Sequence, residues 1–269
     1  MSKTRELAYR YDLLVAPDWR ERFDCIVSEE VQLPTKGCIL DVNCGTGGYA
    51  IEMAEKMGGQ GEVTGTDSCA ERIEIARAKA NVKKIAEVTF EQSLPYDLGF
   101  QDDEFDAVIG DASLLPEDVI EDMLVEMLRV AAPDATLVLK LATRGSFDEF
   151  FSLYWEVLHD AGLDGELWSD LQSLINERPT VSDAEATASR AGLRNVVSVT
   201  RKEEFLYETG DEFLASPLIA DNFLSPWLEI VSEDRRQEIY DALSSIIERE
   251  RVGAPFDVSI KATVIKGLK

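Results

Sequence analysis

The sequence predicts an α/β fold: a doubly wound, mostly parallel seven-stranded sheet with helices on both faces. Two features predict it. Short β-rich segments alternate with helical patterns along the first half of the chain, and this alternation is typical of a parallel sheet. The first β-rich segment runs directly into a glycine-rich turn, and such turns lie at the carboxyl edge of parallel sheets, where ligands bind. The last strand is expected to be antiparallel, and helical insertions are expected after strands five and six.

The first half of the chain contains five of the expected strands. They cover residues 38–42, 62–67, 87–92, 105–111 and 135–143, and helices are expected at 49–57, 70–86 and 116–132. Ser68 is suited to cap the second of these helices, and Pro116 suits the first turn of the third. Because a crossover through a helix returns the chain in the same direction, the strands on either side run parallel.

The second half continues the sheet but interrupts it twice. Residues 146–178 are mostly helical in pattern, and a helix at 180–193 follows, for which Ser182 and Glu185 form an expected capping box. A strand is expected at 194–208 and a second helical insertion at about 209–230. A helix from about Ser232 to Arg251 then precedes a closing strand at 255–267, whose alternation is typical of an antiparallel or edge strand.

We predict a single domain over residues 1–269, a length that suits one large α/β domain. Its expected parts are an N-terminal helical cap at 1–36, a ligand-binding core at 37–145, a helical lid insertion at 146–178, and the C-terminal part of the sheet at 179–269. The first insertion is expected to move as a lid, because it follows strand five at the edge where ligands enter. Gly145, Gly162 and Gly165 are its expected hinges.

The composition excludes several classes of protein. The formal net charge is −25, and so acidic a surface repels nucleic acid and anionic lipid. No apolar run approaches the roughly 20 residues that cross a bilayer, and the N-terminus lacks the apolar segment of a secretory signal. We therefore predict a cytoplasmic protein with no nucleic-acid partner and no membrane association. The four cysteines lack the spacing of a zinc site or a disulfide framework, and no metal site is predicted.

Acidic residues are concentrated in one segment. Between Glu91 and Glu126 the chain has twelve Asp or Glu residues and no Lys or Arg. Such a segment is typical of a solvated acidic face. It also suits a docking surface for a basic partner, and both interpretations stay open.

The stretch CILDVNCGTGGYA, residues 38–50, ends a buried strand in a carboxylate and places three glycines within four residues. These glycines remove Cβ atoms that would keep a ligand from the backbone N–H groups, and Asn43 tolerates the positive φ that a tight turn needs. Asp67 ends the second strand 22 residues after Gly45. This spacing is expected of an acid that accepts hydrogen bonds from both ribose hydroxyls. The combination predicts a nucleoside-like ligand.

Four motifs, in order over residues 38–141, resemble those of the class I S-adenosylmethionine-dependent methyltransferases. The first motif of that family resembles LDVNCGTGGYA, and its second strand and helix resemble VTGTDSCAERIEIARAKA. The segment entering its fourth strand resembles DLGFQDDEFDAVIGDASLL, and its fifth strand with the preceding helix resembles MLRVAAPDATLVLKL. The resemblance implies S-adenosyl-L-methionine as cofactor and methyl transfer as activity.

The resemblance also implies which residues form the cofactor site. Asp41 would orient the methionine ammonium, Asp67 would bind the ribose hydroxyls, and Ser93 with Leu94 would meet the adenine. The last residues of strand four would lie where the methionine moiety and the acceptor meet. The full implied set is Asp41, Asn43, Gly45, Thr46, Gly47, Asp67, Ser68, Ser93, Leu94, Gly110 and Asp111.

Two departures from the family's pattern bear on activity. Asn43 stands where the first glycine is usual, and APDAT replaces the usual Pro-Gly-Gly turn. Because Asn43 lies in the first motif, a non-catalytic, cofactor-binding regulatory protein is one alternative. Methyl transfer from a sulfonium needs mostly positioning, so no catalytic residue is assigned. Asp111 suits a structural or cofactor role as well as a catalytic one, and the lone His159 is more typical of a structural residue.

The sequence constrains the identity of the methyl acceptor by excluding some classes of substrate. GDASLL follows strand four in place of Asn-Pro-Pro-Tyr, which argues against methylation of nucleobase or amide nitrogens. We expect a small-molecule acceptor under the helical aromatic lid of the first insertion. The aromatic residues of that lid have helical spacing and also suit core packing; they are Phe147, Phe150, Phe151, Tyr154 and Trp155. A protein methyltransferase that acts on a basic partner through the acidic segment is a second alternative.

Overall fold

The computed structural model describes residues 2–250 and 253–269. It divides into two compact units. Unit 1 comprises Met1–Ala142, Thr180–Thr200 and Ala262–Lys269, and unit 2 comprises Thr143–Pro179 and Arg201–Lys261. The single domain over 1–269 stays a prediction, and both predicted insertions fall within unit 2.

The seven predicted strands form one sheet with the order β3-β2-β1-β4-β5-β7-β6. The strands β1 to β5 pair in parallel, and the last strands run antiparallel, which confirms the predicted fold class. Their bounds are β1 Gly37–Val42, β2 Gly61–Asp67, β3 Val88–Gln92, β4 Phe105–Asp111, β5 Ala131–Thr143, β6 Arg194–Tyr207 and β7 Phe256–Leu268.

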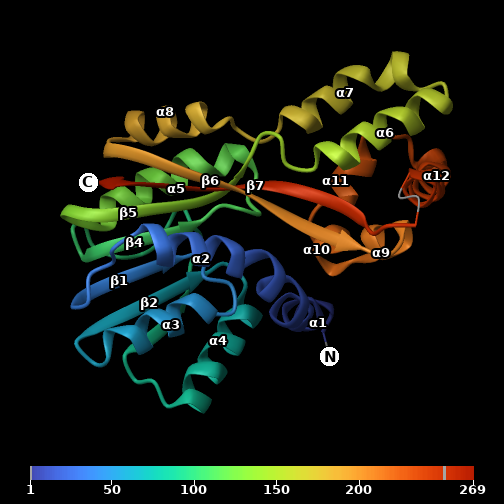
Figure 1. Cartoon of the computed structure of the whole chain (residues 1–269). Coiled ribbons are helices and arrows are strands. Elements are labelled where there is room, and N and C mark those ends of the chain that lie inside the picture. Colours follow the sequence, from blue (N-terminus) through green and yellow to red (C-terminus); the bar gives the residue numbers. More distant parts are fainter. Residues whose placement is uncertain (1, 251–252) are drawn as a thin grey trace. The chain divides into compact units, whose positions relative to one another are not determined.

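Helices cover both faces of the sheet in unit 1. The helices α5 (Glu117–Val130) and α8 (Val181–Ala191) lie on one face. The helices α2 (Glu21–Glu30), α3 (Gly48–Met57) and α4 (Ala70–Lys83) lie on the other (Figure 1). The chain enters through α1 (Lys3–Arg10) and a π-helical segment, η1 (Tyr11–Arg20). The predicted N-terminal helical cap is thus helical from residue 3 to residue 30.

The two faces of the strands differ in polarity at the carboxyl end. Alternate residues of β1, β4 and β5 join α5 and α8 in a buried apolar cluster, among them Leu40, Val108 and Leu139. The residues between them point to the opposite face, and there β1, β4 and β5 carry Asp41, Asp111 and Lys140 near their carboxyl ends. All three side chains are buried. The fold therefore brings charged groups together beneath η1 and α2.

Unit 2 has a core of its own that is rich in aromatic residues. Phe150 stacks on Trp227 with ring centroids 4.6 Å apart. Four residues of the predicted aromatic stripe are buried, whereas Trp155 is exposed and stacks on His159. The helices are α6 Asp148–Asp160, α7 Asp164–Asn176, α9 Gly210–Ala215, α10 Pro217–Asn222, α11 Leu224–Glu229, η2 Glu233–Arg235 and α12 Arg236–Glu250. Most of the stripe therefore serves core packing in this unit.

The predicted cap of α8 was wrong by two residues. Thr180 is the N-cap, and its hydroxyl accepts a hydrogen bond from the backbone N–H of Asp183 while the Asp183 carboxylate accepts from the Thr180 N–H. Two overlapping capping-box patterns exist in this stretch. The earlier one forms because Thr180 has the extended backbone that an N-cap requires. The predicted end of the last helix at Arg251 lies outside the described residues.

None of the helices within residues 2–250 and 253–269 is long and apolar enough to cross a membrane.

Candidate functional site

The carboxyl ends of β1, β4 and β5 place three charged side chains in a row. Asp111 and Lys140 are register partners in the parallel pair of β4 and β5. Asp41 lies one strand further along, because β1 pairs with β4 at Asp41 and Ile109. Register partners point to the same face of a sheet, so the row follows directly from the pairing of the strands.

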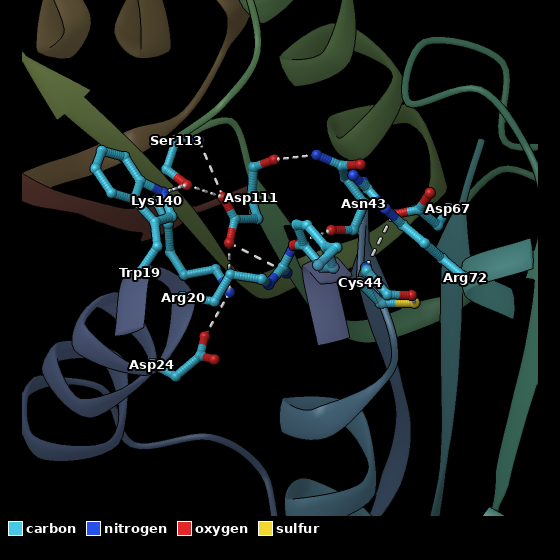
Figure 2. A network of polar contacts seen from close by, with 12 residues as sticks. Trp19, Arg20, Asp24, Asn43, Cys44, Asp67, Arg72, Asp111, Ser113 and Lys140 are labelled. Carbon is cyan, nitrogen blue, oxygen red and sulfur yellow. Dashed lines mark hydrogen bonds and ion pairs between the residues drawn. The ribbon is translucent and has the colours of Figure 1, made fainter. Parts of the chain in front are cut away.

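Asp111 is the centre of a buried polar network. Its Oδ1 accepts hydrogen bonds from the backbone N–H of Ser113, at 2.9 Å, and from the Ser113 hydroxyl, at 2.6 Å. The Ser113 hydroxyl in turn accepts one from Trp19 Nε1, at 2.8 Å. Its Oδ2 lies 3.1 Å from Arg20 Nη2 and 3.3 Å from Lys140 Nζ (Figure 2). Burial alone would raise the pKa of Asp111, but Arg20, Lys140 and Ser113 outweigh it and lower this pKa to about 2.

Lys140 joins the network to α2. Its ammonium lies 2.6 Å from Asp24 Oδ1, as Figure 2 shows, and the whole side chain is buried. Burial would lower the pKa of Lys140, but Asp24 and Asp111 hold it above its ordinary value. Lys140 is therefore charged at every physiological pH, and it neutralises two carboxylates that the fold has removed from water.

Asp41 differs from its neighbours because its carboxylate has no hydrogen-bond partner. Both oxygens are buried, and neither has a donor within hydrogen-bond distance among the described residues. Burial raises the pKa of Asp41 to about 6, although Lys140 and Arg20 act in the opposite direction. A buried, unpartnered carboxylate is costly to the folded state. The position is therefore suited to receive a hydrogen-bonding or cationic group from outside the chain.

Asn43 takes the conformation that the turn after β1 requires. Its φ is +58°, as predicted for a residue that tolerates the left-handed region. Its Nδ2 donates to the carbonyl of Asp111 at 2.6 Å, and its own carbonyl accepts from Arg20 Nη1 at 2.8 Å. The asparagine thus supplies the backbone geometry of the glycine that is usual here, and its side chain also ties β1 to β4.

Asp67 organises the same turn from the end of β2. Its Oδ2 accepts from the Gly45 N–H, and its Oδ1 accepts from the Cys69 N–H, each at 2.9 Å. Arg72 Nη1 lies 3.8 Å from Oδ2 (Figure 2). A carboxylate has about four acceptor sites, so these contacts leave acceptor capacity on Asp67.

Two of the predicted glycines allow neighbouring side chains of the protein to pack closely against the backbone. A Cβ atom on Gly47 would lie 2.6 Å from the Phe90 ring and 2.8 Å from Ala76. One on Gly110 would lie 2.5 Å from Met123 of α5. Contacts with neighbouring side chains therefore explain why Gly47 and Gly110 are small. Their backbones nevertheless lie at the carboxyl edge of the sheet, where the ligand was predicted.

The N-terminal segment covers Gly45. A Cβ atom on this glycine would meet the Tyr11 hydroxyl at 2.8 Å and Arg20 Nη1 at 3.2 Å. Arg20 donates to the Tyr11 hydroxyl at 3.0 Å, and the Arg72 guanidinium lies 3.8 Å from the centre of the Tyr11 ring. Tyr11 and Arg20 therefore occupy the approach to the turn that the sequence predicted for a ligand.

The remaining predicted residues lie around this edge with different partners. Thr46 donates its hydroxyl to Asp12 Oδ1 at 2.5 Å, so its side chain faces the N-terminal segment. The predicted cap of α4 was wrong by one residue: Cys69 is the N-cap, no side chain caps the helix, and Ser68 comes just before it. The Ser93 backbone N–H donates to the Asp67 carbonyl at 3.2 Å, and its hydroxyl is buried without a partner among the described residues. Leu94 is exposed and bridges to Asp97.

Sequence reasoning missed the residues that neutralise the site, namely Arg20, Asp24 and Lys140. One signal could have found Lys140: it is the single charge in the apolar run TLVLKLA, and a charge inside a buried strand needs a partner. No comparable signal marks Arg20 or Asp24. They lie in an ordinary amphipathic stretch, and only the tertiary fold brings them to the sheet.

Comparisons with known proteins agree with this geometry. A family model described as "Methyltransferase domain" matches residues 39–134. Demethylmenaquinone methyltransferase of Deinococcus radiodurans is 32% identical over 160 residues, which cover 56% of this chain and 64% of that protein. Demethylmenaquinone methyltransferase of Anoxybacillus flavithermus is 31% identical over 186 residues, which cover 66% of this chain and 77% of that protein.

Solved structures share the fold. The YcgJ protein of Bacillus subtilis has a TM-score of 0.60 at 20% identity, with 93% of this chain and 98% of that chain covered. Phosphoethanolamine N-methyltransferase 2 of Haemonchus contortus, solved with phosphomonomethylethanolamine and S-adenosylhomocysteine, has a TM-score of 0.59 at 16% identity, with 100% of this chain and 61% of that chain covered. Together with the sequence matches, they show that this chain belongs to the class I S-adenosylmethionine-dependent methyltransferase family.

Proposed function

We propose that this chain binds S-adenosylmethionine at the carboxyl edge of β1, β2 and β4 and transfers its methyl group to a small-molecule acceptor. The observation that carries the proposal is the Asp41 carboxylate, which is buried and unpartnered next to the glycine turn. The matching family and the fold support the same cofactor. When bound, S-adenosylmethionine supplies an activated methyl group on a sulfonium.

The charges of the site fit a cationic ligand. The buried groups near Asp41 are two cations, Arg20 and Lys140, and three carboxylates, Asp24, Asp41 and Asp111. The cations are matched by Asp24 and Asp111 through close contacts, so the negative charge of Asp41 is left over. An ammonium group that donates to Asp41 would balance this charge and satisfy its oxygens.

The ribose and the adenine of the cofactor would lie along the carboxyl ends of β2 and β3. Asp67 would accept hydrogen bonds from the ribose hydroxyls with its remaining acceptor capacity. Ser93, whose buried hydroxyl has no partner among the described residues, would hydrogen-bond the adenine, and Leu94 would pack on it. Tyr11 would have to leave Gly45, because its hydroxyl lies where a ligand would approach that turn.

The chain's own contribution to methyl transfer would be positioning and exclusion of water. Asp111 is a poor general base: its pKa is about 2, and both its oxygens are engaged by Ser113, Arg20 and Lys140. We therefore assign Asp111 a structural role, as the counter-ion that holds the N-terminal segment to the sheet. No side chain is assigned as a base.

A small molecule is the acceptor class that the comparisons favour. The two relatives are named for demethylmenaquinone, which is a small molecule and not a protein or nucleic acid. The acidic segment is a weaker candidate for docking a basic protein, because part of its charge is neutralised within the chain: Arg129 contacts Asp102 and Glu126, and Lys269 contacts Asp103.

The first insertion is proposed as the cover of the acceptor, because it follows β5 directly. Hydrogen exchange across residues 146–178 should then slow when S-adenosylhomocysteine is added, and slow further with an acceptor. If this segment is as protected in the free protein as β1 and β4 are, the lid proposal is wrong.

Two measurements test the function. Calorimetry with S-adenosylhomocysteine tests binding, and transfer of labelled methyl from S-adenosylmethionine into a cell extract tests turnover. We expect binding, and label in the low-molecular-mass fraction. Label in protein would instead support a protein methyltransferase, and binding without transfer in any fraction would support a regulatory protein. Absence of binding would contradict the proposal as a whole.

A further inference from the structure

A groove on the surface of unit 2 is lined by two exposed tryptophans. It lies between α6 and α7 (Figure 1), all its lining residues come from these two helices, and its volume is about 400 Å³. Trp155 is 41% exposed and Trp168 is 51% exposed, whereas the other two of the four tryptophans in the chain, Trp19 and Trp227, are buried. Large exposed apolar side chains that gather at one place mark an interaction site.

Neither Trp155 nor Trp168 belongs to the buried core of unit 2. Trp168 has no ring contact and no hydrogen bond in the described part of the chain. Trp155 stacks one face on His159, with ring centroids 5.4 Å apart, but His159 does not line the groove. His159 also contacts Asp164 at 3.0 Å, so a protonated His159 adds no net charge here. Aromatic surface on the groove side is therefore accessible to a ligand.

The charge around the groove is negative. Residues 146–177, which contain α6 and α7, include eight Asp or Glu residues and no Lys or Arg. Asp148 lines the groove, is exposed, and forms no ion pair with any residue that the structure describes. Lys261 comes close to Gly145, as Asp148 does, but it does not line the groove. The Asp148 carboxylate is therefore available to a positively charged ligand.

We propose that this groove binds a small organic cation, namely a molecule with an alkylated ammonium group. The face of an indole ring attracts a cation more strongly than the other aromatic side chains do, and the groove has two such rings. Asp148 supplies a negative charge beside them. An alkylated ammonium suits both features, because its alkyl groups pack on the rings and its charge faces the carboxylate.

The charge of this face argues against other occupants. The carboxylates of α6 and α7 repel an anionic ligand or an anionic lipid surface. A second copy of the chain that docked through the same face would bring the same eight carboxylates against the groove, and like charges across an interface cost free energy. A neutral apolar molecule would contact the rings but gain nothing from Asp148. The observations therefore favour a cation over each of these.

The test compares choline, whose nitrogen carries three methyl groups and a positive charge, with 3,3-dimethylbutan-1-ol, which has the same shape and no charge. The four indole N–H signals of the full chain in an NMR spectrum, recorded without cofactor at constant ionic strength, report binding. Choline should shift the signals of Trp155 and Trp168 and leave those of the buried Trp19 and Trp227 unchanged. Half-saturation should occur at a concentration at least about fivefold lower than with the alcohol, a difference of about 1 kcal/mol.

Substitutions at exposed positions show which groups carry this preference. Trp168→Leu keeps an apolar side chain and removes one indole face, so it should abolish the preference, as read from the Trp155 signal. Asp148→Asn should reduce the preference about twofold to threefold, because an exposed ion pair is weak. Asp170→Asn is the matched control, since it removes from α7 an exposed carboxylate that does not line the groove. It should leave the preference unchanged.

Equal half-saturation by choline and the alcohol would overturn the proposal, as would a preference that survives Trp168→Leu or a shift of all four indole signals together. Equal losses in Asp148→Asn and Asp170→Asn would show attraction by the overall charge alone and would also overturn it. So would indole shifts on dilution of the protein without a response to choline, because they would assign the groove to contact between copies of the chain.

Trp168→Phe keeps the proposal testable if Trp168→Leu lowers the melting temperature. Because a phenyl ring also attracts a cation, though less strongly than an indole, this variant should keep part of the preference for choline. Complete loss of the preference in a folded Trp168→Phe protein would contradict the proposal. No cofactor is present in these titrations, so none of their outcomes depends on methyl transfer.

Discussion

Asp41 and Asp111 end neighbouring strands on the same face of the sheet, yet their surroundings differ. Asp111 has partners on both oxygens and a pKa of about 2, whereas Asp41 has none among the described residues and a pKa raised by burial to about 6. The buried cations Arg20 and Lys140 thus pair with Asp111 and Asp24 and leave the Asp41 carboxylate without a partner. Asp111 supports the fold, and Asp41 is available to a ligand.

The two carboxylates should also affect stability in opposite directions as pH changes. The folded pKa of Asp111 lies below its ordinary value, so its contribution to stability is present above pH 4 and is lost as pH falls through about 2. The folded pKa of Asp41 lies above its ordinary value, so its burial costs stability at neutral pH. That cost is relieved as pH falls from about 6 towards 4.

The largest expected effect comes from removing the cation that Asp111 and Asp24 share. Lys140→Met leaves both buried carboxylates short of a partner and should lower the free energy of unfolding by about 3 to 5 kcal/mol. Urea denaturation measures it. The control is Lys83→Gln, which breaks a half-exposed pair with Glu55 and should change the free energy by less than about 1 kcal/mol. Similar effects of the two substitutions would show that the buried network adds no special stability.

Asp41→Asn should separate stability from binding. At pH 8 it removes the burial of an unpartnered charge, a cost of about 3 kcal/mol, and leaves an unpartnered amide that costs about 1 kcal/mol. We expect a net stabilisation of about 1 to 2 kcal/mol, with affinity for S-adenosylhomocysteine reduced about 10- to 100-fold. Asp111→Asn should instead lower the free energy of unfolding. Loss of stability in Asp41→Asn would mean that Asp41 has partners in solution.

Asp67→Ala should weaken the binding of S-adenosylhomocysteine by about 1 to 3 kcal/mol. Part of this loss arises through the turn, since the Asp67 carboxylate accepts from the backbone N–H groups of Gly45 and Cys69. Calorimetry gives the affinity, and the melting temperature of the free protein reports the effect on the turn. Unchanged affinity would show that Asp67 does not bind the cofactor.

The smallest effect is expected from Asn43→Gly, which restores the glycine usual in the family. Glycine keeps the positive φ of +58° and loses only the hydrogen bond to the Asp111 carbonyl, so stability should fall by about 1 kcal/mol. Affinity for the cofactor should change less than about threefold. A large gain in affinity or in methyl transfer would show that Asn43 impairs the native site.

The sequence predicted the frame of the site better than its electrostatics. Strand ends and the glycine turn follow from local patterns, so Asp41, Asn43 and Asp67 lay where they were expected. The place of Lys140 in the site depends on the register of β5 against β4, and that of Arg20 depends on the packing of η1 on the turn. Neither arrangement can be read from the local sequence.

We propose that the bare carboxylate of Asp41 receives the ammonium group of the cofactor, and titration with S-adenosylhomocysteine at several pH values between 5 and 8 measures this contact. Because Asp41 must be ionised to bind a cation, and its pKa in the free protein is about 6, affinity should be constant above pH 7 and fall about tenfold by pH 5. Asp41→Asn should bind weakly and without this dependence. Equal affinity and equal pH dependence in the two proteins would show that Asp41 does not bind the ammonium group.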